Sequence, residues 1–191
     1  MAKLMKEGYG QLELNLVAFP RDGRVVAQYK AGETFTTKDK DSDEHYLENG
    51  MLLKVDGAKR CVDKAAPAFG DIFALNYSTE HMYDERQYGL KTFRLNSTDD
   101  FYPRLGYLSA GDKFTTNAVC YDTTKSVMEA WDEIKRDFEG GTAFYGVACE
   151  EGYIKLVKNI TAAQNGPILR VIKVTEMPDT QPAVKFEVIR G

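Results

Sequence analysis

The chain has 191 residues, of which 43% are hydrophobic and 28% are charged, and its formal net charge is −4. These proportions are ordinary for a folded globular chain and exclude long disordered, collagen-like or low-complexity architecture. A non-specific nucleic-acid binder needs a large basic excess to release counterions, and 25 Lys and Arg against 29 Asp and Glu exclude one.

The N-terminal segment and the cysteines bear on where the chain is made. Residues 1–8 include two lysines and no apolar run, so we expect no signal peptide. No stretch approaches the roughly 18 apolar residues of a membrane span. Cys61, Cys120 and Cys149 are odd in number and widely spaced, which disfavours a disulfide framework or a zinc site. We expect synthesis in a reducing cytoplasm, with Cys120 and Cys149 as buried apolar side chains.

Most of the chain is predicted to form strands. Residues 12–18 alternate apolar and polar side chains, which is the period of a half-buried strand. Residues 20–23 have turn chemistry and precede an extended run at 24–30, so we expect these two strands to form a hairpin. Further strands are expected at 51–55, 71–77, 91–95, 143–148 and 152–158.

The C-terminal region has the clearest strand pattern. Residues 168–177 and 183–189 are runs rich in β-branched side chains, separated by a loop that contains Pro178 and Pro182. Because proline interrupts strand pairing and stiffens a loop, the pattern predicts an antiparallel hairpin with a wide connection.

One amphipathic helix is predicted at about 126–139. Ser126 and Glu129 fit a capping box, and Gly140 with Gly141 provides the stop. The apolar stripe recurs at helical spacing and consists of Val127, Trp131, Ile134 and Phe138. A single such helix in a strand-rich chain is expected to pack on a sheet or to close the end of a barrel.

A short repeat bears on the domain organisation. The segment A-G-E-T-F-T-T at 31–37 recurs as A-G-D-K-F-T-T at 110–116. Each copy predicts a turn that leads into a strand, with its Phe pointing inward and its Thr side chains pointing outward. Duplication would give an N-terminal β unit at 1–78, an aromatic and charged connecting segment at 79–106, and a C-terminal β unit with the helix at 107–191. A single domain of residues 1–191 is the alternative. The predicted fold class is mainly β, an antiparallel barrel or sandwich with one amphipathic helix.

Motifs that carry catalysis or bind metals are few. Residues 39–43 open like an EF-hand loop, but Glu44 stands where that loop needs glycine and Gly50 where it needs a bidentate glutamate. Two histidines, His45 in that acidic segment and His81 near Asp84, do not make a metal triad. We therefore expect no enzyme, no cofactor and no metal. A small hydrolase that uses His81 and Asp84 is the remaining enzymatic alternative.

An aromatic and basic segment is the candidate contact surface. Arg, Tyr, Met and Phe are side chains that contribute strongly to protein interfaces. A loop that packs on its own domain is the alternative, and the N-terminal arm at 1–10 is a second candidate surface. The predicted partner-binding residues are Met82, Tyr83, Arg86, Tyr88, Phe101, Tyr102 and Arg104.

Four segments prompt a resemblance to a known class, and the resemblance extends over most of the chain. They are residues 9–15 (YGQLELN), 47–52 (LENGML), 79–86 (TEHMYDER) and 107–117 (YLSAGDKFTTN). They resemble virion proteins of tailed bacteriophages, in particular capsid decoration (cement) proteins and related minor head proteins.

The resemblance implies a β-rich accessory protein, made in the host cytoplasm, that binds the capsid surface and reinforces the expanded shell. It implies that the partners are the major capsid protein and neighbouring copies of the chain, with no nucleic acid, no membrane and no catalytic residues. The predicted helix departs from small cement proteins, whereas tail-tube proteins often carry such a helix. A phage tail-tube or connector protein is therefore the second prediction.

Overall fold

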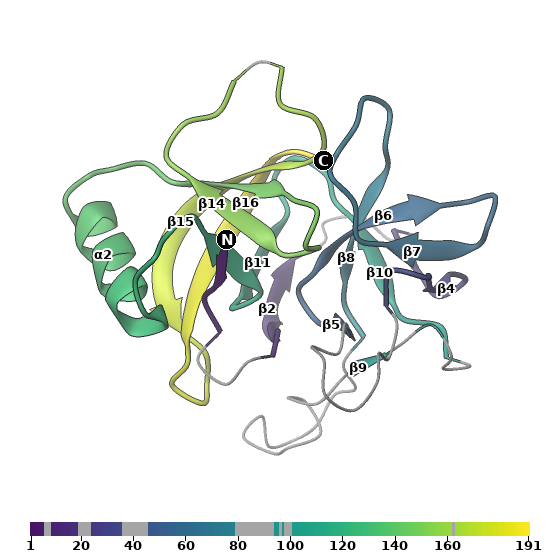
Figure 1. The fold of residues 1–191 in the computed structure, drawn as a ribbon, viewed down its shortest axis with the longest axis horizontal. Helices are drawn as coiled ribbons and strands as arrows, with labels where there is room; N and C mark the ends of the chain where they lie inside the picture. The colour runs from purple at the N-terminus through teal and green to yellow at the C-terminus, as the bar shows by residue number, and fades with distance from the viewer. Residues whose placement is uncertain are drawn as a thin grey trace.

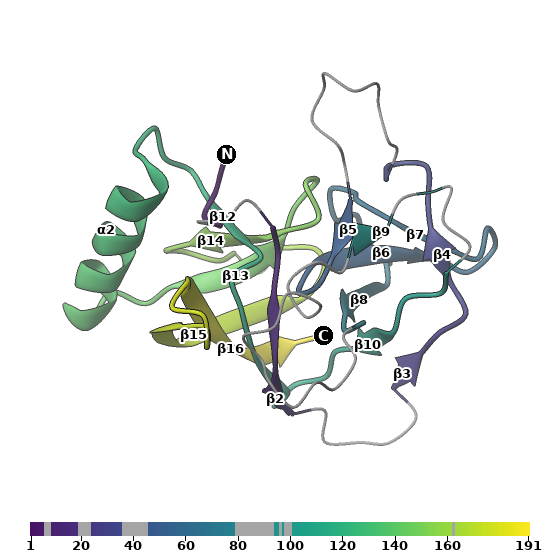
Figure 2. The ribbon, with the colours of Figure 1, turned by 90° about the horizontal axis from the view of Figure 1, so that it is seen from below.

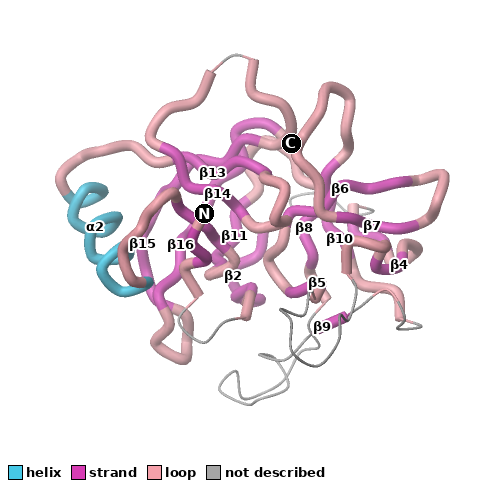
Figure 3. Tube along the Cα trace, viewed as in Figure 1, coloured by secondary structure: helices cyan, strands magenta, loops and turns pink. Residues whose placement is uncertain are grey.

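The structure is a computed structural model that describes residues 1–5, 9–18, 24–35, 46–78, 94–95, 97, 101–161 and 163–191. Within these residues the chain is mainly β, with two large mixed sheets side by side, a two-stranded sheet and one helix (Figures 1 and 3). The predicted fold class is confirmed. Neither large sheet closes on itself among the described strands, so these strands form no closed barrel.

The larger sheet has eight strands, and all its neighbouring strands are antiparallel except β12 and β14. Its longest pair, β15 with β16, confirms the predicted C-terminal hairpin. In order across the sheet the strands are β1 (Ala2–Lys3), β12 (Val119–Tyr121), β14 (Ile154–Val157), β13 (Tyr145–Ala148), β15 (Ile168–Glu176), β16 (Pro182–Arg190), β11 (Lys113–Thr116) and β2 (Leu12–Ala18).

The smaller sheet has six strands, of which β4 and β7 are parallel. Two further strands, β5 (Leu47–Glu48) and β9 (Arg94–Leu95), pair with each other. In order across the smaller sheet the strands are β3 (Val25–Val26), β10 (Leu105–Tyr107), β8 (Phe73–Asn76), β6 (Leu52–Asp56), β7 (Cys61–Asp63) and β4 (Lys30–Ala31).

The predicted hairpin between residues 12–18 and 24–30 is wrong. Strand β2 pairs with β11 in the larger sheet, whereas β3 pairs with β10 in the smaller one. An Asp-Gly turn signal acts locally, but strand partners are selected by burial of apolar faces that distant segments supply. The strand predicted at 12–18 is present with the same ends, and those predicted at 51–55, 71–77, 143–148 and 152–158 are present with shifted ends. Of the strand predicted at 91–95 the structure describes residues 94–95.

The central strands of the smaller sheet bury both of their faces. Leu52 and Leu75 pack into a core that they share with the larger sheet and the helix, while Leu53 and Ala74 belong to a second core. Strands covered on both faces have continuous apolar sequences instead of alternating ones. This explains why β6 and β8 lack the polar alternation of a half-exposed strand.

The helix α2 (Val127–Glu139) confirms the predicted helix and its start. Ser126 accepts a hydrogen bond from the backbone of Glu129, and the Glu129 side chain accepts one from the backbone of Ser126. Trp131 and Ile134 are buried in the first core, and the Trp131 Nε1–H donates to the carbonyl of Leu4 at 2.7 Å. Of the two expected positions α2 takes the one on a sheet: it contacts β15 of the larger sheet and lies at the end of the molecule away from the smaller sheet (Figure 2).

The two repeated segments each bury a phenylalanine but differ in backbone conformation. Phe35 and Phe114 are both fully buried, which confirms that each points inward. Thr115 and Thr116 are buried as well, so the predicted outward direction of the threonines is wrong in the second copy. In the second copy a turn precedes β11, whereas in the first copy β4 precedes the turn. The division of the chain at 78 and 107 stays a prediction. Both large sheets contain strands from more than one of the three predicted segments, because β1 and β2 belong to the larger sheet and β10 belongs to the smaller one.

A buried ion pair joins the two sheets where the chain passes from one to the other. Arg24, next to β3, donates to both carboxylate oxygens of Asp112 at 2.6 and 2.8 Å, and to the carbonyl of Tyr107 at 3.1 Å. The Asp112 side chain is fully buried and also accepts from the backbone of Ser109. This bidentate bond is the main reason that the pKa of Arg24 is raised.

Replacing Arg24 by Met should lower the free energy of unfolding by about 3 kcal/mol, because it leaves a buried carboxylate without its cation. The matched control is Lys113→Met, which breaks a half-exposed pair with Glu187 at 3.6 Å and should cost less than about 1 kcal/mol. Urea denaturation of both variants measures the difference. Equal losses would contradict a special role for the Arg24–Asp112 pair.

Candidate protein-binding surfaces

The structure describes three of the seven predicted partner-binding residues. Phe101 and Tyr102 expose 51% and 46% of their surface, and Arg104 is also exposed. The other four, Met82, Tyr83, Arg86 and Tyr88, lie outside the described residues, as do both histidines and the acidic segment at 39–43. We refer to residues 101–104 as the 101–104 segment.

The backbone of the 101–104 segment is anchored although its side chains are exposed. The Arg104 N–H donates to the Ser78 hydroxyl at 2.9 Å, and the Arg104 carbonyl accepts from the Tyr77 N–H at 2.7 Å. Pro103, between the exposed side chains, is buried. A surface held in this way loses little conformational entropy when a partner binds.

The Tyr102 ring contacts a lysine side chain from another strand of the smaller sheet. The Lys30 ammonium lies 5.3 Å from the centre of the Tyr102 ring, which is within the range of a cation–π interaction. Lys30 is on β4, at the far edge of the smaller sheet from β3. The segment therefore presents two aromatic rings and a guanidinium, side chains typical of interface hot spots.

A second apolar surface, which the sequence analysis missed, is the loop between β7 and β8 at residues 64–72. We refer to it as the Phe69 loop. Phe69 is 96% exposed and Ile72 is 59% exposed. The Asp71 carboxylate accepts from the Ala68 N–H at 2.9 Å and pairs with Lys54 Nζ at 2.8 Å. The contact with Lys54, and to a smaller extent the hydrogen bond from Ala68, lower the pKa of Asp71.

A sequence signal for this loop was present. Phe69 lies between Pro67 and Gly70, in a turn that connects two predicted strands. Gly70 has a φ of +84°, in the left-handed region that favours glycine. An aromatic side chain at the tip of such a turn projects away from the sheets, so the pattern indicates an exposed ring.

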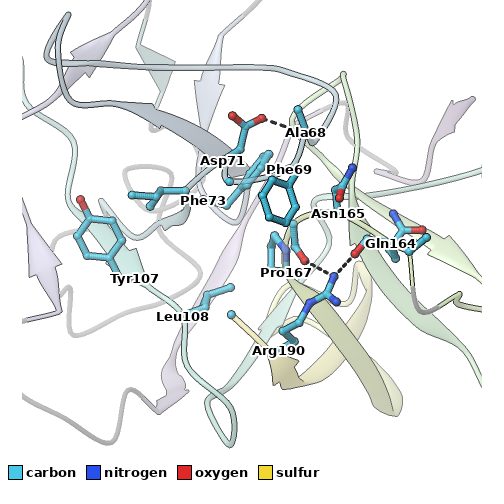
Figure 4. A pocket seen from close by; sticks show the side chains of 15 residues that line it. Ala68, Phe69, Asp71, Phe73, Tyr107, Leu108, Gln164, Asn165, Pro167 and Arg190 are labelled. Atoms are coloured by element: carbon cyan, nitrogen blue, oxygen red, sulfur yellow. Dashed lines mark hydrogen bonds between the residues drawn. The ribbon is translucent and has the colours of Figure 1, made fainter.

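A groove of about 670 Å³ lies beside Phe69, between the ends of the two sheets (Figure 4). Phe73, Tyr107 and Leu108 line one side, and the loop at 163–167 lines the other. Arg190 donates to the carbonyls of Gln164 and Gly166, the latter at 2.9 Å, and so holds this loop in place. The guanidinium is engaged in these bonds, so the groove offers mainly an apolar shape to a partner's side chain.

The two surfaces lie at opposite ends of one strand pair. In the antiparallel pair β8–β10, Leu105 is opposite Asn76 and Tyr107 is opposite Ala74. The Phe69 loop leads into the start of β8, while the 101–104 segment leads into β10 opposite the end of β8. The smaller sheet therefore separates the two surfaces and holds them in a fixed relation.

The described part of the chain has neither a metal-binding cluster nor a membrane-spanning helix. No group of three or more His, Cys, Asp and Glu residues there is arranged to hold a metal ion. No helix there is long and apolar enough to cross a membrane. Cys120 and Cys149 are buried, as predicted.

No protein-family model, no curated protein and no solved structure matches this chain. What the chain binds is therefore inferred from its own surfaces.

Phe69 and Phe73 are a matched pair that tests the exposed loop. Phe69→Ser should change the free energy of unfolding by less than about 0.5 kcal/mol, because the ring contributes no burial. Phe73→Ala should cost about 3 kcal/mol, because Phe73 is only 7% exposed and belongs to the first core. Urea denaturation measures both values. A comparable loss in Phe69→Ser would show that the loop packs against the molecule.

Proposed function

We propose that the chain is a structural virion protein of a tailed phage that binds the capsid surface and reinforces the shell. The single observation that carries the proposal is the pair of exposed apolar surfaces, the 101–104 segment and the Phe69 loop. The first is hydrogen-bonded to Ser78, just after β8, and the second is held through Asp71 by Lys54 on β6. The resemblance of the sequence to decoration and minor head proteins supports the same assignment.

The mechanism that we propose is adhesion. A protein that binds only the assembled shell stabilises the shell by mass action, since its binding free energy is lost when the shell comes apart. Two surfaces on one rigid sheet allow one molecule to contact two neighbouring subunits, or one subunit and another copy of the chain. Weak single contacts are then sufficient, because the second contact forms at a high effective concentration.

The polar groups at the two surfaces favour adhesion over catalysis. Asp71 is paired with Lys54, and Arg190 is hydrogen-bonded to two carbonyls. A general acid or base needs a titratable group within reach of a substrate proton. Here the charged groups brace loops, so we propose that the chain catalyses no reaction.

A tail-tube or connector protein is the second candidate, and helix α2 is the observation that favours it. The helix packs on the larger sheet through Trp131 and Ile134, the arrangement that the sequence analysis associated with tail tubes. Such a protein would self-associate into rings. Negative-stain images of the purified chain separate the two functions, because rings or tubes support the tail role.

Capsid binding is tested by co-sedimentation with expanded shells of the major capsid protein encoded in the same genome. The triple variant Phe101→Ser, Tyr102→Ser, Arg104→Ser should bind at least about tenfold more weakly, since hot-spot side chains contribute more than about 1 kcal/mol each. The control is Met128→Ser on α2, which removes an apolar side chain that is 46% exposed, as Tyr102 is. Wild-type protein that fails to co-sediment, or a triple variant that binds like wild type, would contradict the proposal.

A further inference from the structure

Two buried cysteines that are far apart in the sequence lie in contact. Cys120 is on β12 and Cys149 directly follows β13, and their sulfur atoms are 3.6 Å apart across 29 residues of chain. Strand β14 lies between β12 and β13 in the sheet. Neither cysteine belongs to the two candidate surfaces.

Hydrogen bonds give the two thiols different roles. The Cys149 thiol donates to the Tyr153 carbonyl at 3.2 Å, whereas the Cys120 thiol contacts the sulfur atoms of Cys149 at 3.6 Å and of Met1 at 3.8 Å. The contact between the two thiols is the main cause that lowers the pKa of Cys149 and raises the pKa of Cys120. Because the thiolate is the nucleophilic form of cysteine, Cys149 is the more reactive of the two.

We propose that Cys120 and Cys149 are a disulfide-forming pair, with a peroxide as the oxidant. The geometry carries the proposal: the two sulfur atoms are already in contact at 3.6 Å, and bond formation brings them to about 2.05 Å. Cys149 lies at a turn closed by the Gly152 N–H and the Cys149 carbonyl at 3.0 Å, and it is 7% exposed against 1% for Cys120. A small oxidant therefore reaches Cys149 first.

The reaction balances with one peroxide molecule. The Cys149 thiolate attacks one oxygen of hydrogen peroxide, the O–O bond breaks, and a sulfenic acid and hydroxide form. The Cys120 sulfur then attacks the Cys149 sulfur and displaces its hydroxyl group, which leaves as hydroxide. The two thiol protons combine with the two hydroxide ions to form water. Two thiols and one hydrogen peroxide molecule therefore give one disulfide and two water molecules. The sulfur atoms lose two electrons, and the peroxide oxygens gain them.

The bond would lock the part of the molecule that holds the helix. The 29-residue separation encloses the whole of α2 and links β12 to the end of β13. A cross-link of this kind stabilises a fold mainly by restricting the unfolded chain. In a reducing cytoplasm the thiols stay reduced, and oxidation follows release from the cell. That timing rests on the proposed function, whereas the bond itself does not.

Cys61 provides an internal control. It lies on β7 in the smaller sheet, and its thiol contacts the Asp63 carboxylate at 3.4 Å. Burial, together with Asp63, raises its pKa to about 11, so its thiolate is scarce at neutral pH. The other two cysteines of the chain are in the pair. Cys61 is therefore expected to stay reduced under conditions that oxidise Cys120 and Cys149.

The test treats the folded full-length chain with hydrogen peroxide at neutral pH and then alkylates the remaining thiols. We expect two of the three thiols to become unreactive towards iodoacetamide, with a mass lower by two hydrogen atoms. A non-reducing digest should contain one peptide pair, which joins Cys120 to Cys149. Dithiothreitol should restore both thiols, and the oxidised chain should melt several degrees higher than the reduced chain.

Two variants complete the experiment. Cys61→Ala should form the same disulfide bond. Cys149→Ala should keep Cys120 as a thiol, and peroxide should not raise the melting temperature of this variant. Three results would overturn the proposal: oxidation of Cys149 to sulfinic acid without a bond, dimers linked through Cys61, or three reactive thiols after peroxide treatment and unfolding. Should Cys149→Ala fail to fold, the peptide map of the wild-type chain decides alone. Loss of capsid binding would leave this result unchanged.

Discussion

The contact between Arg24 and Asp112 fixes how the two large sheets are joined. It lies where the chain leaves β10 in the smaller sheet and enters β11 in the larger one, and Arg24 also donates to the Tyr107 carbonyl at that crossing. The groove beside Phe69 depends on this joint, since Tyr107 and Leu108 line it together with a loop of the larger sheet. Fixing the sheets here therefore also fixes the shape of the groove.

Further buried polar contacts join segments of different sheets. The Glu48 carboxylate accepts from the Gly10 N–H at 2.9 Å and from the Tyr153 hydroxyl at 3.0 Å. Asn76 on β8 donates to the Glu48 carbonyl at 2.8 Å. Such bonds contribute modestly to the net free energy but are costly to leave unmade, so they select one arrangement of the sheets. The apolar cores supply most of the stability, and the polar contacts supply the geometry.

The proposed roles of the molecule are assigned to different sheets. Both exposed apolar surfaces extend from the smaller sheet, at opposite ends of β8 and β10. The thiol pair lies in the larger sheet, on either side of β14 and in the part that carries α2. Binding in this arrangement depends on pre-positioned side chains, and the disulfide would strengthen the scaffold without changing the surfaces. The two proposals can therefore fail or succeed independently.

The sequence alone determined the elements whose signals are local. The capping box at Ser126, the apolar stripe of α2 and the β15–β16 hairpin depend on residues near one another in the chain, and all three are confirmed. The exposure of the 101–104 segment did not follow from its residue types, because aromatic side chains are often buried, and only the structure shows it. Only the tertiary structure decided the partners of β2 and β3, the Arg24–Asp112 pair across 88 residues, the Cys120–Cys149 contact and the groove beside Phe69. The physical reason is that these contacts depend on which apolar faces are buried together, and a local pattern of residues does not specify that choice.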